Sequence, residues 1–175
     1  MTQTRSCFKL DLGRLNELAR AVKDDPEAAK FTFSAKTRWR DGAVTETRAR
    51  ENVIVADEPE ALGGTDSAAD PVELLLASLT SCVSIGLVTH AAKRGVELRD
   101  FEIDVEGDLD VRGYLGDESV RPGFSAIRYS VRVESDAPPE VIEDIVGAAE
   151  QSSPMLDNIS NGVPVSSQVE VTSAV

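Results

Sequence analysis

The feature that most constrains this sequence is a run of 19 positions, Leu74 to Ala92, without aspartate, glutamate, lysine or arginine. Its length approaches that of a membrane-spanning helix. Serine, threonine, cysteine and histidine side chains within the run lower its hydrophobicity, and the chain has no second segment of this kind. The run therefore predicts a helix that is buried on all sides inside a soluble protein.

Local signals mark both ends of this helix. Asp70 suits the N-cap, Pro71 suits the first helical position, and Glu73 completes a capping box three residues after the cap. Gly95 ends the helix, because glycine readily adopts the left-handed conformation that follows a helix C-terminus. The sequence thus predicts one long helix over residues 71–94.

The charge of the chain excludes several classes of function. The 175 residues include 18 basic and 31 acidic side chains, which give a formal net charge of −13. A nucleic-acid binder needs a surplus of lysine and arginine, and an anionic membrane surface attracts the same residues. The length and the apolar content of 41% are typical of one soluble globular domain. We therefore expect neither a nucleic acid nor a membrane as a partner.

The cysteines and the single histidine limit the possible sites. Cys7 and Cys82 are too few for a disulfide scaffold or a four-ligand zinc site. His90 stands alone near the helix end, where we expect a hydrogen-bonded rather than a catalytic residue, and no lysine-containing phosphate loop is present. The N-terminus also lacks the apolar stretch of a signal peptide. We expect a cytoplasmic protein with no metal and no cofactor.

The first third of the chain is predicted to contain a helix and a hairpin. Apolar residues at helical spacing predict a short helix over 12–22, and alternation from Phe31 predicts a strand that reaches Arg40. Asp41-Gly42 predicts a hairpin turn in which both positions have positive φ, with a return strand over about 43–55. We divide the chain into an N-terminal tail with its helix, residues 1–27, and a main domain, residues 28–175.

Two longer strands are predicted over 101–111 and 127–133, each with one apolar and one charged face. Paired in a sheet, they bring the arginines of the second near the carboxylates of the first, so we interpret this face as solvated rather than as a cation site. A helix from Pro138, a new helical segment from Ser153-Pro154 and a last strand over 163–171 follow. This order predicts an α+β fold with mainly antiparallel sheets around the buried helix.

Cys82 lies in the middle of the uncharged helix and offers the clearest route to chemistry. A buried free cysteine usually behaves as a small hydrophobic residue with an inert thiol. A reactive thiolate at this position needs a positive charge close to it, and arginine is the natural source because it stays charged when partly buried. On the residues alone, both interpretations of Cys82 stay open.

Three segments resemble the OsmC/Ohr family. The stretch ALGGTDSAADPVELLLASLTSC, residues 61–82, is similar to the family's helix signature, in which a cysteine follows a proline by eleven positions. TRWRDG, residues 37–42, is similar to the turn that presents an arginine in the family. AAEQSSPMLDNISNG, residues 148–162, is similar to the segment that carries a second cysteine before a proline. The matches run in order from about residue 31 to residue 172.

The resemblance implies an OsmC-like intertwined homodimer, in which two long central helices are covered by sheets from both subunits. It also implies a thiol peroxidase that reduces organic hydroperoxides in oxidative-stress defence. Carried onto this sequence, Cys82 matches the peroxidatic cysteine, which becomes a sulfenic acid, and Arg40 matches the arginine that activates it. Ser153 occupies the place of the resolving cysteine.

Two positions depart from the family pattern. Ser153 cannot form a disulfide, so an external thiol or dithiol reductant, or Cys7 from the tail, would have to reduce the sulfenic acid. The glutamate that holds the arginine in the family falls on Val72 here, and Glu73 is the candidate accessory residue one place later. Three hypotheses stay open: a one-cysteine peroxidase; a catalytically degenerate dimer that binds an apolar small molecule or acts as a slow thiol redox sensor; and a structural dimer without a ligand site.

Overall fold

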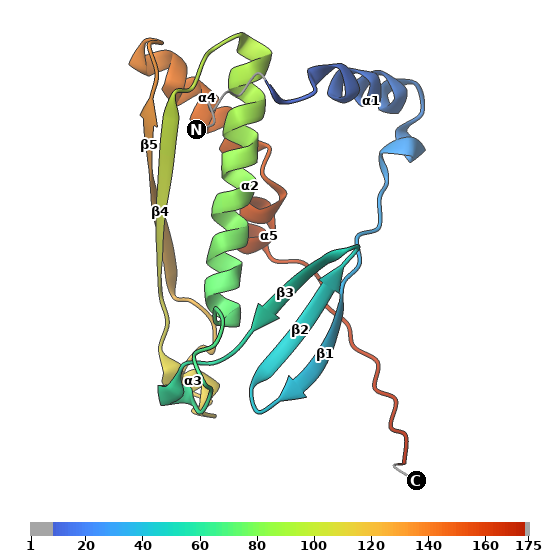
Figure 1. The fold of residues 1–175 in the computed structure, drawn as a ribbon, viewed down its shortest axis with the longest axis vertical. Helices are drawn as coiled ribbons and strands as arrows, with labels where there is room; N and C mark the ends of the chain where they lie inside the picture. Colours follow the sequence, from blue (N-terminus) through green and yellow to red (C-terminus); the bar gives the residue numbers. More distant parts are fainter. Residues whose placement is uncertain (1–8, 174–175) are drawn as a thin grey trace, which may run out of the picture.

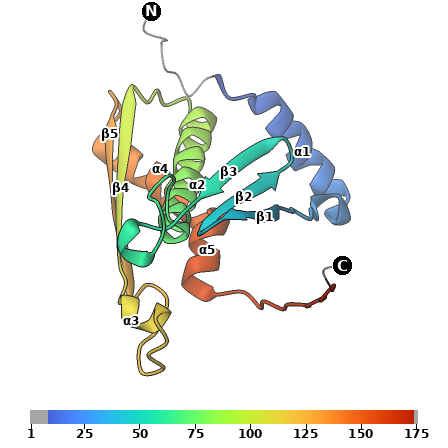
Figure 2. The same cartoon turned by 60° about the horizontal axis from the view of Figure 1, so that its bottom comes forward.

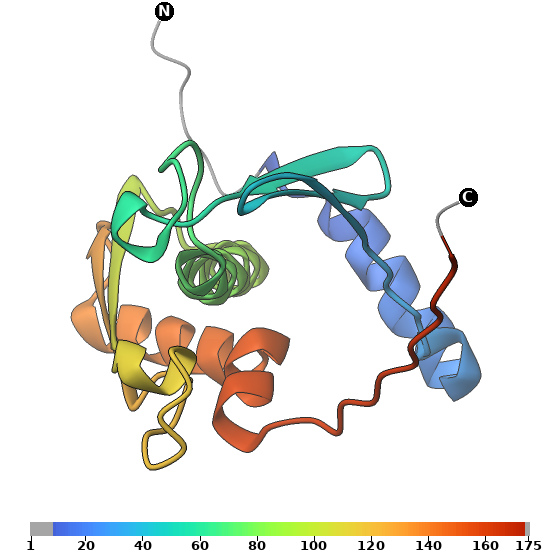
Figure 3. The ribbon, with the colours of Figure 1, turned by 90° about the horizontal axis from the view of Figure 1, so that it is seen from below.

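The computed structural model describes residues 9–173, and its elements are arranged around the long helix α2 (Figure 1). In chain order these are α1 (Leu12–Asp24), η2 (Pro26–Ala29), β1 (Lys36–Asp41), β2 (Val44–Ala49), β3 (Asn52–Ala56), η3 (Glu60–Leu62), α2 (Pro71–Arg94), β4 (Asp100–Asp108), α3 (Val111–Tyr114), β5 (Ala126–Glu134), α4 (Pro139–Gln151) and α5 (Pro154–Asn161). Viewed end-on in Figure 3, α2 has the β4–β5 hairpin on one side, α4 and α5 on a second and the β1–β2–β3 sheet on a third. The α+β class and the long central helix are confirmed.

Helix α2 begins and ends where the sequence predicts. The Asp70 side chain accepts a hydrogen bond from the backbone N–H of Val72, and the Glu73 side chain accepts one from the N–H of Asp70 at 2.9 Å, which completes the capping box. Gly95 follows the helix with φ of 66°, in the left-handed region. By length and composition alone, α2 is also the one helix within residues 9–173 that could cross a membrane, a criterion that core helices of soluble proteins also meet.

The loop that leads into α2 is held by a buried carboxylate. Asp57 is 1% exposed and accepts hydrogen bonds from the backbone and hydroxyl groups of Thr65 and Ser67 and from the N–H of Glu58. These hydrogen bonds hold the pKa of Asp57 well below its usual range, and the bond from the Thr65 hydroxyl makes the largest contribution. The carboxylate therefore stays ionised at neutral pH and fixes the path of the chain toward the start of α2.

The β4–β5 hairpin has the two faces that the alternation predicts. The strands pair antiparallel, with Ile103 opposite Val131 and Val105 opposite Tyr129, so apolar side chains share one face. On the other face, Arg128 forms ion pairs with Glu106 and Asp108, and Arg132 with Glu102 and Asp104. This confirms the expected pairing of arginines with carboxylates. The first strand is shorter than predicted, because β4 ends at Asp108 and residue 111 begins α3.

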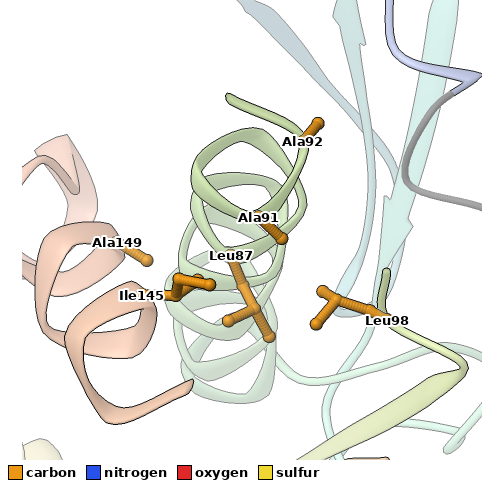
Figure 4. Packing of buried hydrophobic residues seen from close by; sticks show 6 residues of the cluster. All are labelled: Leu87, Ala91, Ala92, Leu98, Ile145 and Ala149. Carbon is orange, nitrogen blue, oxygen red and sulfur yellow. The ribbon is translucent and has the colours of Figure 1, made fainter. Parts of the chain in front are cut away.

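The core lies where α2, α4 and the start of β4 meet. Its buried members are Leu87, Ala91, Ala92, Leu98, Ile145 and Ala149 (Figure 4). Figure 4 shows Ile145 and Ala149 of α4 directed at the turn of α2 that carries Leu87. The two helices come close because Gly86 has no side chain: a Cβ there would lie 3.1 Å from the Cβ of Ala149. Small residues thus bring α4, and α5 after it, against α2.

Replacing Ile145 by alanine is expected to lower the free energy of unfolding by about 2–5 kcal/mol, because the side chain is 0% exposed and its removal leaves a cavity between α2 and α4. Urea unfolding followed by circular dichroism measures this loss. Leu18→Ala is the matched control, because Leu18 is 45% exposed on α1 and its truncation should cost less than about 0.5 kcal/mol. Equal losses in both variants would contradict this location of the core.

The two strands predicted in the N-terminal part of the chain need correction. The strand predicted from Phe31 begins only at Lys36, and the return strand predicted over 43–55 is divided into β2 and β3. The chain reverses between them at Arg50, which has φ of 57°, and no glycine marks this turn in the sequence. In the first turn only Gly42 has positive φ, at 49°, so the expectation of two positive φ values at Asp41-Gly42 was wrong.

The C-terminal prediction was also wrong. Residues 162–173 contain no helix or strand, although their valines alternate as in a strand. The side chains of Val165, Val169 and Val171 are between 82% and 90% exposed. Figure 2 shows this segment running away from α5 toward the C-terminus. A strand needs a neighbour for its backbone hydrogen bonds, and within the described residues no strand pairs with this segment.

Helix α2 is not buried on all sides within one chain. Its buried residues are Leu79, Val83, Leu87, Ala91 and Ala92, whereas Ile85 is 66% exposed. Complete burial of α2 is therefore not reached within one chain, and the resemblance implies that sheets from both subunits cover this helix. The N-terminal helix is confirmed as α1 and extends to Asp24, with none of its residues buried.

Candidate active site around Cys82

Cys82 lies at the middle of α2, is partly buried, and has a free thiol. Its sulfur receives a hydrogen bond from the hydroxyl of Ser153, with an Oγ–Sγ distance of 3.2 Å. Ser153 is only 4% exposed, so the contact joins a buried hydroxyl to a partly buried thiol. The tertiary structure thus joins two of the candidate residues, which are 71 positions apart in the sequence.

The position of Ser153 follows from the break between α4 and α5. α4 ends at Gln151 and α5 begins at Pro154, as the Ser-Pro pair predicts. Ser153 is the N-cap of α5, and its Oγ accepts the backbone N–H of Leu156 at 3.2 Å. The same oxygen therefore caps one helix and faces the cysteine of another.

Ser152, the residue before Ser153, also links the α4–α5 junction to α2, through His90. The Ser152 hydroxyl donates to the carbonyl of Ala148 at 2.8 Å, so it accepts from Nε2 of His90 at 3.0 Å. Nδ1 of His90 then accepts from Arg94 at 3.3 Å. Burial, with the nearby charges of Lys93 and Arg94, lowers the pKa of His90, so the ring is neutral at pH 7. His90 is hydrogen-bonded near the helix end, as expected.

Arg40 lies on β1, away from this cluster. Its guanidinium forms an ion pair with Glu46 of β2 at 2.5 Å, and this hydrogen bond is the main reason that the pKa of Glu46 is lowered. The register of β1 and β2 shifts between Trp39 and Asp41, so Arg40 occupies a β-bulge. Bulges redirect side chains and are common beside active sites. Within the described chain, Arg40 is thus paired with a carboxylate and is not joined to Cys82.

The charged side chains of β1 and β2 stay together across the bulge. The sequence pattern puts Arg40 in one alternating set with Lys36 and Arg38, which would point all three the same way. Arg40 contacts Glu46, the residue that lies opposite Arg38, so the bulge does not separate Arg40 from this charged set. No residue type in the TRWRDG segment signals the bulge, so sequence reasoning missed it.

Glu73 is occupied at the start of α2. Its carboxylate accepts the N–H of Asp70, which is the capping function that the sequence predicts. Nine residues separate it from Cys82, which is about 13 Å along the helix and half a turn around it. The capping contact accounts for this residue. Cys7, the other thiol of the chain, lies outside the described residues.

An apolar cavity of about 580 Å³ lies along α2 before Cys82. Leu79 and Leu75, about one and two turns before the cysteine, form part of its wall, together with Met155 of α5. Arg121 is the one charged residue in the lining. A second cavity, of about 620 Å³, lies between β5 and α4 and has no residue of α2 in its lining. There the hydroxyl of Tyr129 donates to Glu150 at 2.7 Å. Sequence reasoning did not find either cavity, because each is formed by elements that are distant along the chain.

The family comparison covers more than half of the chain. The model described as OsmC-like protein matches residues 64–168, a range that includes Cys82 and Ser153 and leaves out Arg40. A comparison with curated proteins found no match.

Solved structures share the fold. A putative osmotic stress induced and detoxification response protein from Psychrobacter arcticus is similar at a TM-score of 0.62 and 16% identity, covering 76% of this chain and 92% of that chain. An OsmC-like protein from Mycoplasma pneumoniae is similar at 0.65 and 12%, covering 75% and 89%. An organic hydroperoxide resistance protein OsmC from Legionella pneumophila is similar at 0.57 and 20%, covering 75% and 91%. At these identities the likeness extends to the fold.

Proposed function

Because the chain belongs to the OsmC-like protein family, we propose that it is a one-cysteine, thiol-dependent peroxidase that reduces organic hydroperoxides in oxidative-stress defence. The observation that carries the proposal is the sulfur of Cys82, partly buried at the middle of α2 and hydrogen-bonded by Ser153 at 3.2 Å. The organic hydroperoxide resistance named for the Legionella relative supports the same substrate class.

The proposed reaction needs only one protein sulfur. The Cys82 thiolate attacks the terminal oxygen of the hydroperoxide, the O–O bond breaks, and the leaving alkoxide takes a proton to become an alcohol. The sulfur is oxidised to sulfenic acid. A first external thiol condenses with it to form a mixed disulfide and water, and a second thiol releases the Cys82 thiol and an external disulfide. Low-molecular-weight thiols or a dithiol protein of a reducing cytoplasm are the proposed reductants.

The proposed partner is a second copy of the chain. The single chain exposes 13351 Å², whereas a compact monomer of 18.8 kDa exposes about 8,300 Å². Apolar side chains contribute to this excess: Ile85 on α2 is 66% exposed, Trp39 on β1 is 72% exposed, and the C-terminal valines are between 57% and 90% exposed. A homodimer that covers α2 with strands from both chains would bury them.

A dimer also gives Arg40 a role. A thiolate inside a protein needs a nearby positive charge, and within one chain the guanidinium is bound to Glu46. Strand β1 is exposed along its whole length, and the bulge at Arg40 lies at the tip of the β1–β2 hairpin. We propose that this hairpin brings Arg40 to Cys82 of the second copy, where it stabilises the thiolate and polarises the peroxide.

The central test is Cys82→Ser in an assay of cumene hydroperoxide consumption with an added dithiol. We expect consumption to fall to the rate measured without protein, because the hydroxyl of serine cannot replace a thiolate as nucleophile. Cys7→Ser is the matched control and should keep the wild-type rate, since the proposed cycle uses one sulfur. Equal consumption by wild type and Cys82→Ser would eliminate the peroxidase.

One observation favours a second candidate function. The cavity beside α2 is lined mainly by apolar residues and has the size of a small-molecule site. A catalytically degenerate dimer could hold an apolar ligand there, with Cys82 acting as a slow redox sensor. Binding of an apolar probe without any peroxide consumption would favour this function over the peroxidase.

A further inference from the structure

The hydroxyl of Ser153 has a fixed hydrogen-bonding direction. Its oxygen accepts the N–H of Leu156 at 3.2 Å, which is the capping bond of α5. A serine hydroxyl carries a single hydrogen, and at Ser153 that hydrogen is directed to the sulfur of Cys82, at an Oγ–Sγ distance of 3.2 Å. The residue is 4% exposed, so its hydroxyl is largely shielded from water.

We infer that Ser153 is a positioning residue, whose hydroxyl stabilises the thiolate of Cys82 and fixes the direction from which that sulfur reacts. The inference deepens the proposed function and rests on it for its role in catalysis. A hydrogen bond to an ionised acceptor is about twice as strong as one between neutral groups, so the contact favours the thiolate over the thiol. The position that resembles the family's resolving cysteine thus has a different role in this chain.

The rigid surroundings of Ser153 make this role specific. Pro154 fixes the first position of α5, and the N–H of Leu156 holds the oxygen in place. Ser152, the adjacent residue, directs its hydroxyl to Ala148 and binds His90 instead of the cysteine. Of these two neighbouring serines, only Ser153 has a hydroxyl that contacts the sulfur, and an experiment can use this difference.

The test measures the rate of Cys82 alkylation by iodoacetamide as a function of pH, in a Cys7→Ser background so that one thiol reacts. For Ser153→Ala we expect the midpoint of the rate profile to move up by about one pH unit or more. At pH values below the midpoint, this shift means an approximately tenfold slower alkylation. Ser153→Thr, which keeps the hydroxyl and the cap, should restore the original midpoint.

Two further variants separate this role from a purely structural one. Ser153→Asp keeps a good N-cap, but an ionised carboxylate has no hydrogen to donate and repels a thiolate, so the midpoint should rise at least as far as in Ser153→Ala. Ser152→Ala removes the neighbouring hydroxyl and should leave the midpoint in place. An unchanged midpoint in Ser153→Ala, or equal shifts in Ser152→Ala and Ser153→Ala, would overturn the inference.

Peroxide consumption by the same proteins distinguishes this inference from the proposed function. If wild type consumes no hydroperoxide while Ser153→Ala still raises the alkylation midpoint, the peroxidase fails and the contact with the thiolate stands. If wild type is an active peroxidase and Ser153→Ala alkylates as the wild type does, the peroxidase stands and the role of Ser153 is overturned.

Discussion

Replacing Ser153 by cysteine is expected to give a protein that forms a disulfide between positions 82 and 153 when it is treated with peroxide. The Ser153 oxygen already lies 3.2 Å from the sulfur of Cys82, and a disulfide bond needs about 2 Å between sulfur atoms. A small rotation of the two side chains closes that gap. The new thiol lies next to the sulfenic acid, so it should resolve the sulfenic acid within the chain before an external thiol does.

This result is measured in a Cys7→Ser background by counting free thiols and by peptide mass spectrometry before and after one equivalent of cumene hydroperoxide. Nearly all molecules of S153C should lose both thiols, and dithiols should then recycle the protein better than monothiols. S152C is the matched control, because the Ser152 side chain binds His90 rather than Cys82 and should leave the two thiols unlinked. Two free thiols in oxidised S153C would contradict the geometry around Cys82.

Co-expression of Cys82→Ser chains with Arg40→Gln chains is expected to restore peroxide consumption, although each variant alone is inactive. If Arg40 acts on the second copy, a mixed dimer contains one complete site, formed by the cysteine of one chain and the arginine of the other. Random pairing makes half of the dimers mixed, so about a quarter of the wild-type rate should return. Two different affinity tags allow the mixed dimer to be purified and assayed directly.

The matched control is Arg48→Gln, since Arg48 binds the same Glu46 from β2 but lies outside the bulge. This variant should stay active by itself. If purified mixed dimers are as inactive as the separate variants, Arg40 does not act across the dimer. Full activity of Arg40→Gln alone would remove the arginine from the mechanism altogether.

Much of the secondary structure could be predicted from short-range signals. The capping box at Asp70 and Glu73 and the glycine at position 95 define α2 because each acts on backbone groups within a few residues. The alternation in β4 and β5 predicted both the apolar face and the pairs of arginines with carboxylates. The same local rules predicted the start of α5 at Pro154.

Several predictions failed because they depend on partners that the sequence pattern does not specify. The valines over 163–171 alternate like a strand, but a strand also needs a neighbour, and no strand within residues 9–173 pairs with them. The turn at Arg50 and the bulge at Arg40 depend on how three strands pair, and neither position carries the glycine that would have signalled them. Complete burial of α2 was predicted from its composition, which cannot say how many chains cover it.

For the candidate site, the sequence by itself determined which atoms are available: a sulfur in an uncharged helix, a serine before a proline and an arginine beside a turn. Only the tertiary structure decided that the hydroxyl of Ser153 meets the sulfur of Cys82, whereas Arg40 meets Glu46. The physical reason is that helix caps and strand alternation act over a few residues. A contact across 71 positions depends instead on the close packing of α4 against α2 at Gly86 and Ala149, which carries the Ser153 junction to the sulfur.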